Sequence, residues 1–214
     1  MPYNADLDAL AAIADAPDTK DVSSAFADYC RLRASGRRRE ALEQLDRFIV
    51  STEEGHFDHR RAFVRWVTAP NGLVDSRLLT PQPVIARIIV PTVDEWRDRE
   101  PDDAEAYFLK GRYGDWTVSE NEPGPLDWFR RAIELAPDHQ GARRAFIDWV
   151  VGHVENAQHE LPLGYLGSPE GDLAEVEEAL RLLDGVEQPH WRVGVGAKLT
   201  HLRDTTEAWV GAVG

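Results

Sequence analysis

Apolar residues recur every three or four positions along most of this chain, the spacing of helices with one buried face. No run of alternating apolar and polar residues is long enough to predict a strand. Proline, glycine and asparagine interrupt the pattern and set the expected ends of the helices. We expect helices over residues 5–16, 21–36, 37–51, 57–69, 80–101, 103–116, 125–136, 141–158, 172–183 and 191–210. The pattern therefore predicts an all-α protein.

The links between these helices constrain how they pack. A link of one or two residues at Gly36 can join only antiparallel neighbours, so we expect a helix hairpin there. Pro91 is expected to kink or split its helix, because proline lacks the amide hydrogen that an α-helix uses. The longest break, residues 161–171, is rich in proline and glycine. We therefore expect a helical array over residues 1–160 and a C-terminal helical pair or cap over residues 161–214, packed on the same core.

One stretch of the chain is nearly duplicated. Residues 60–67 read Arg-Arg-Ala-Phe-Val-Arg-Trp-Val and residues 143–150 read Arg-Arg-Ala-Phe-Ile-Asp-Trp-Val, with identity at six of the eight positions. Each copy lies on a helix that follows a loop. The duplication indicates a repeated unit of several helices, in which each hairpin buries its apolar face by stacking on a neighbour.

The second copy has further features of a repeat around it. Residues 104–107, Ala-Glu-Ala-Tyr, together with Gly111, place small and aromatic residues on one helix. Residues 126–138 form a second helix that closes with Pro137-Asp138, and residues 40–42 after Gly36 look like another second-helix start. These residues resemble the tetratricopeptide repeat family, whose 34-residue helix pairs carry such residues at fixed offsets.

The resemblance covers about half the chain, residues 26–67 and 104–151, and the insertion at residues 117–124 departs from the family pattern. It implies antiparallel helix pairs stacked as a right-handed array, with a concave groove that binds a peptide or protein. In the family register, arginines and one aspartate face this groove, and a tryptophan lies beside the insertion. The partner-binding candidates are Arg33, Arg61, Arg65, Arg112, Trp116, Arg144 and Asp148.

Arginine suits such a groove because its planar fork binds carboxylates with two hydrogen bonds. The alternative interpretation of these arginines is purely structural. Adjacent arginines can lie over tryptophan rings and pair with nearby acids inside the protein.

Charge and cysteine content narrow the classes of partner. The chain carries 24 Lys and Arg against 38 Asp and Glu, a formal charge of −14. A surface of this sign repels phosphate backbones and anionic lipids, so we expect neither nucleic acid nor membrane as a partner. The N-terminal residues lack the pattern of a signal peptide, no apolar run is long enough to span a bilayer, and Cys30 is the only cysteine. These features favour a cytoplasmic protein.

No nucleophile elbow, phosphate-binding loop or zinc-helix pattern occurs, so we expect no enzyme, no cofactor and no metal site. Two other classes stay open. The acidic segment 172–187 would suit a stoichiometric inhibitor that neutralises a basic partner. A helical enzyme would use His153, Glu155 and His159, and it predicts a bound metal, although these residues lack the spacing of a zinc helix.

Overall fold

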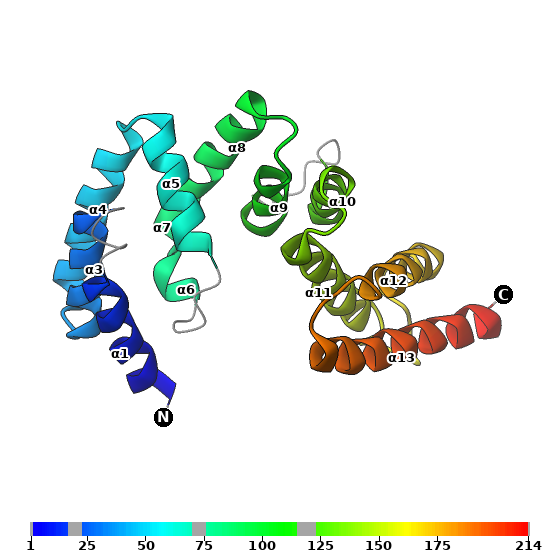
Figure 1. Ribbon diagram of the computed structural model, residues 1–214. Coiled ribbons are helices and arrows are strands. Elements are labelled where there is room, and N and C mark those ends of the chain that lie inside the picture. The colour runs from blue at the N-terminus through cyan, green and yellow to red at the C-terminus, as the bar shows by residue number, and fades with distance from the viewer. Residues whose placement is uncertain (1, 17–22, 70–75, 115–122, 214) are drawn as a thin grey trace. The chain divides into compact units, whose positions relative to one another are not determined.

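The computed structural model describes residues 2–16, 23–69, 76–114 and 123–213, which form helices and loops with no strand among them (Figure 1). The expected all-α class is confirmed. The helices fall into two compact units, Met1–Pro101 and Asp102–Gly214, and each is described on its own. The division expected between residues 160 and 161 falls inside the second unit, because the helices on either side of it pack together.

The first unit contains both full helices and short turns. Its elements are α1 (Pro2–Asp15), α3 (Ser24–Ala34), α4 (Arg38–Glu53), α5 (Phe57–Thr68), α6 (Ser76–Leu79), α7 (Gln82–Val84), the π-helical turn η1 (Ile85–Ile89) and α8 (Val90–Arg99). Helix α3 packs on both α1 and α4, and α5 packs on α8. Ser23 begins α3, since its hydroxyl accepts the Phe26 N–H at 3.1 Å.

Gly36 forms the expected hairpin between α3 and α4. Its φ of 75° is a left-handed conformation that glycine adopts without steric cost. The N–H groups of Gly36 and Arg37 donate to the carbonyls of Arg33 and Leu32 at 3.1 and 3.0 Å, which satisfies the open end of α3. The chain then turns directly into α4, which packs against α3.

Aromatic rings form the core between these helices. Phe26, Phe48 and Phe63 come from α3, α4 and α5, and their ring centroids lie 4.9 to 5.1 Å apart. All three are buried, and their tilted and edge-on contacts are those that aromatic pairs prefer. Cys30 is buried beside them on α3, and burial raises the pKa of its thiol to about 12. This cysteine is therefore a packing residue.

Pro91 does not end its helix. The chain continues from α7 through η1 into α8, and Pro91 is in the first turn of α8. A proline ring clashes with the carbonyl four residues earlier, and the wider π-helical turn just before Pro91 accommodates it. The continuous helix carries Trp96, which is fully buried.

The second unit contains α9 (Ala104–Tyr113), α10 (Pro125–Leu135), α11 (Gln140–Ala157), α12 (Pro169–Leu183) and α13 (Pro189–Val213). Each helix packs on the next in the chain. Helix α11 is central, because it also contacts α9 and α13. Gly111 permits the close approach of α9 and α10, since a Cβ atom there would lie 2.4 Å from Cε1 of Phe129.

The two copies of the duplicated segment have the same pattern of burial. Phe63 and Val67 of α5 are 2% exposed, and the equivalent Phe146 and Val150 of α11 are fully buried. The paired arginines that open each copy are half-buried. Each copy thus presents its phenylalanine and valine to the core of its own unit and its arginines to the rim of that core.

Candidate functional site

The partner-binding candidates divide between the two units. In the first unit they are Arg33 on α3 and Arg61 and Arg65 on α5; in the second they are Arg112 on α9 and Arg144 and Asp148 on α11. Trp116 lies outside the described residues. Arg33 is half-buried. Desolvation raises the pKa of the Tyr29 hydroxyl, and the charge and hydrogen bond of Arg33 oppose that rise. Arg112 is exposed, with its guanidinium 5.3 Å from the centroid of the Tyr113 ring.

Arg61 and Arg65, the two candidates among the arginines of α5, make contacts within the first unit. The guanidinium of Arg61 pairs with Glu100 and lies 5.3 and 5.7 Å from the ring centroids of Phe57 and Trp96. Arg65, one turn later, lies 4.6 Å from the centroid of Trp96. Cation–π contacts of this kind hold a guanidinium against the core. These contacts are the ones expected if the arginines only stabilise the fold, by lying over aromatic rings and pairing with nearby acids.

Helix α11 presents a different arrangement. Arg144 lies one turn before Asp148, and its guanidinium is 5.2 Å from the ring centroid of Trp191 on α13. The Nε atom of Arg144 is buried and has no hydrogen-bond partner among the described residues. Partial desolvation raises the pKa of Asp148, against the opposing effect of the charges on Arg144 and Lys198. Within the described part of the second unit, this pair therefore retains hydrogen-bonding capacity that is not used.

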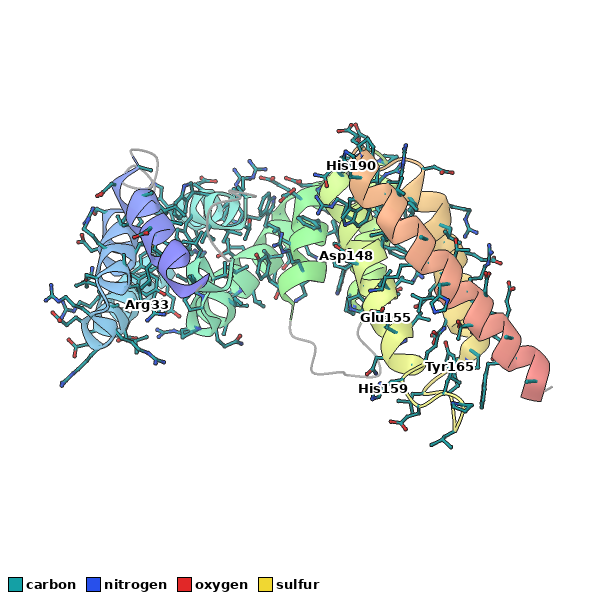
Figure 2. All side chains as sticks on the ribbon, turned by 90° about the horizontal axis from the view of Figure 1, so that it is seen from below. Arg33, Asp148, Glu155, His159, Tyr165 and His190 are labelled. Atoms are coloured by element: carbon teal, nitrogen blue, oxygen red, sulfur yellow. The ribbon has the colours of Figure 1, made fainter. Side chains whose placement is uncertain are left out.

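Further along α11 the same face is polar. Figure 2 shows Asp148 and Glu155 in succession along α11, with α13 beside them. Glu155 is bound by Lys198 of α13, whose Nζ lies 2.7 Å from its carboxylate. An exposed strip with both signs of charge thus runs between α11 and α13. We call Arg144, Asp148, Glu155, Trp191 and Lys198 the α11 strip.

His153, one of the two histidines in the enzyme hypothesis, lies in a different cluster. His153 of α11, Asp172 and Glu175 of α12 bring three potential metal-ligand atoms within 4.8 Å of one another. Nε2 of His153 lies 3.4 Å from Oδ1 of Asp172. Glu155 instead pairs with α13, and His159 is exposed beyond the end of α11. The structure therefore does not bring together the three residues of that hypothesis.

The acidic segment 172–187 is partly committed to internal contacts. Asp172 is 4% exposed, and Glu178 accepts hydrogen bonds from the guanidinium of Arg130 at 2.9 to 3.1 Å. Glu177 is exposed. Only some of the carboxylates in this segment are therefore available to bind a basic partner.

No helix in the described ranges is long and apolar enough to cross a bilayer. The chain matches no known protein family, no curated protein and no solved structure. The function must therefore be argued from the residues of the chain itself.

Proposed function

We propose that the chain is a protein–protein interaction module of helical-repeat type, and that its second unit binds a peptide or protein segment along the α11 strip. The observation that carries the proposal is the half-buried guanidinium of Arg144, held at the Trp191 ring with its Nε unpartnered among the described residues. A buried donor without an acceptor costs about 1 to 3 kcal/mol, and a partner carboxylate that turned the Arg144 side chain outward would remove that cost.

The packing of the second unit supports a repeat architecture. Successive helices pack in pairs, and α11 meets α9 before it and α13 after it. In stacked hairpins, alternate helices form one layer, and that layer lines the binding surface. The right-handed stacking and the capping role of the last two helices belong to the same proposal.

The chemistry of the strip defines the segment that it would bind. Arg144 offers a planar fork to a carboxylate of the partner. Asp148, one turn away, accepts hydrogen bonds from backbone N–H groups or from a basic side chain. Trp191 supplies an aromatic surface next to Arg144. A partner segment with an acidic residue near a basic one fits this order.

The rest of the second unit would orient the segment. Acidic residues outnumber basic ones about two to one in residues 102–214. This excess of acids would disfavour a strongly acidic partner over most of the second unit, whereas a neutral or mixed segment could place its carboxylate near Arg144. The proposal assigns no catalytic step to the chain.

Selection of peptides from a random display library, with the whole chain as bait, tests the proposal. The affinity of the selected peptides would be measured by fluorescence anisotropy for wild type, Arg144→Gln and Arg181→Gln. Arg181 is an exposed arginine of α12 outside the strip and provides the matched control. We expect Arg144→Gln to weaken binding at least about tenfold, the loss of one charged hydrogen bond, and Arg181→Gln to leave it unchanged.

Equal affinity for all three folded proteins would refute the role of the α11 strip. Selection of basic peptides that lose affinity with Glu177→Gln, and steeply with salt, would instead support the acidic segment as the binding surface. Circular dichroism of each variant establishes that a change in affinity is not a loss of fold.

A further inference from the structure

A polar cluster lies between α11 and α12, apart from the strip that faces α13. It contains Asp172, a carboxylate that is 4% exposed, together with His153 and Glu175. Burying a carboxylate is unfavourable unless charge or hydrogen bonds compensate for it. His153 is exposed and Glu175 is half-buried, so the cluster opens to solvent on one side.

We propose that His153, Asp172 and Glu175 form a binding site for a zinc-type divalent cation. One imidazole nitrogen and two carboxylate oxygens are ligands that Zn²⁺ accepts. Zinc bonds of about 2.1 Å in tetrahedral geometry place ligand atoms about 3.4 Å apart. The observed 3.4 Å between Nε2 of His153 and Oδ1 of Asp172 matches that separation.

The third ligand has the freedom to complete the site. All three ligand atoms lie within 4.8 Å of one another. Oε2 of Glu175 is buried and has no hydrogen-bond partner among the described residues, although buried acceptors are nearly always satisfied. Rotation of this half-buried side chain would close the remaining distance. Three protein ligands would leave a fourth position for water.

Neighbouring groups hold the first two ligands in place. The Tyr165 hydroxyl donates to Oδ2 of Asp172 at 2.7 Å, which leaves Oδ1 facing His153. The ring of Trp149 stacks on the imidazole of His153 with centroids 4.8 Å apart. Such outer contacts orient the ligands of metal sites and tune their affinity. Here they orient an oxygen and a nitrogen toward the same point.

The electrostatics of the cluster also favour a cation. Desolvation raises the pKa of Glu175, and the charges of Asp172 and Glu178 act in the same direction, while His153 and Arg130 oppose them. A divalent cation would neutralise two carboxylates that otherwise repel each other. Residues 102–214 are acidic overall, so the surrounding field attracts cations as well.

Isothermal titration of the whole chain with Zn²⁺, after treatment with a chelator, tests this site. We expect one saturable site per chain, weakened at least about tenfold by His153→Gln or by Glu175→Gln. The exposed Glu177 and His159 provide matched controls on α12 and after α11, and Glu177→Gln and His159→Gln should bind zinc like wild type. Intense visible absorption after loading with Co²⁺ would report four-coordinate geometry at the same residues.

Several outcomes would overturn the proposal. One is the absence of saturable binding; another is wild-type affinity in both His153→Gln and Glu175→Gln, which would place the metal elsewhere. Equal loss of affinity in the control variants would indicate diffuse binding to surface acids. Competition by a tenfold excess of Mg²⁺ would refute the zinc-type assignment, because Mg²⁺ prefers oxygen ligands and keeps much of its water.

Discussion

Replacing Gly111 with alanine tests whether the close contact between α9 and α10 is required. A Cβ atom at this position would lie 2.4, 2.6 and 3.1 Å from three carbons of the Phe129 ring. Carbon atoms in contact prefer 3.5 to 4.0 Å, so the ring would have to retreat by about 1 Å. Phe129 is 3% exposed, and the ring has no solvent-filled space into which to move.

The expected magnitude combines two opposing effects. Overpacking a core costs about 1 to 3 kcal/mol, whereas alanine gains about 1 kcal/mol over glycine within a helix. We expect Gly111→Ala to lower the free energy of unfolding by up to about 2 kcal/mol. Gly152→Ala is the matched control, because Gly152 is also within a helix and a Cβ there would meet nothing within 4 Å. It should stabilise the protein by up to about 1 kcal/mol.

Urea denaturation followed by circular dichroism measures both variants. Their free energies of unfolding should differ by about 1 to 3 kcal/mol, the cost of overpacking alone, because both variants gain the same helix propensity. Phe129→Leu removes part of the ring, so Gly111→Ala should cost less in that background. If Gly111→Ala is as stable as Gly152→Ala, the close packing of α9 on α10 inferred from this contact is refuted.

Two further predictions concern titratable residues. Burial raises the pKa of Cys30 to about 12. As the pH rises, the thiol ionises first in the unfolded chain, where its pKa is 9.0. The contribution of the buried thiol to the free energy of unfolding is therefore complete below pH 9 and is lost at higher pH. Between pH 8 and pH 10 wild type should lose about 1.4 kcal/mol more stability than Cys30→Ala; equal losses in urea denaturation would contradict this. His139 caps α11 through Nδ1 and contacts Glu105 through Nε2, each at 3.0 Å. His139→Ala should therefore cost about 1 kcal/mol more than His139→Asn, which keeps a cap, and equal thermal stabilities would contradict the cap.

Local rules predicted most of the helices but not every break. Gly36 ended α3 as expected, because a left-handed turn is a property of a few neighbouring residues. At Pro91, where we expected a kink or a split, the chain continues through one widened, π-helical turn, a detail that the expectation did not include. The buried residues on both sides, Val84 to Trp96, favour a continuous helix by their packing. The local tendency of proline to interrupt a helix takes no account of that packing.

The apolar stripe of a helix can be broader than the face that is buried. Leu42 lies in the apolar pattern of α4, but it is 52% exposed, while Ala41 and Leu45 are buried. A helix buries only the part of its apolar face that a neighbour covers. The area that the neighbour covers depends on how the helices pack. The sequence of one helix therefore does not predict which apolar residues at the edge of its face are buried.

The candidate sites were harder to predict than the helices. The sequence grouped His153 with its neighbours in the chain, whereas its partners Asp172 and Glu175 come from the next helix, beyond a loop. The one local signal was the three-residue spacing of those two acids, which places both on one face of α12. Only the packing of α12 on α11 shows that this face meets His153.

Helical geometry separates the two proposed sites on α11. With about 3.6 residues per turn, Arg144 and Asp148 share a face, whereas His153 lies about half a turn around the helix from Arg144. Arg144 faces Trp191 of α13, and His153 faces Asp172 of α12. Sites without shared partners respond independently to substitution. Arg144→Gln should therefore leave zinc affinity unchanged, and His153→Gln should leave peptide affinity unchanged. Loss of both activities in either variant would mean that α11 moves as one element, and that the metal and the peptide bind to a common state of the unit.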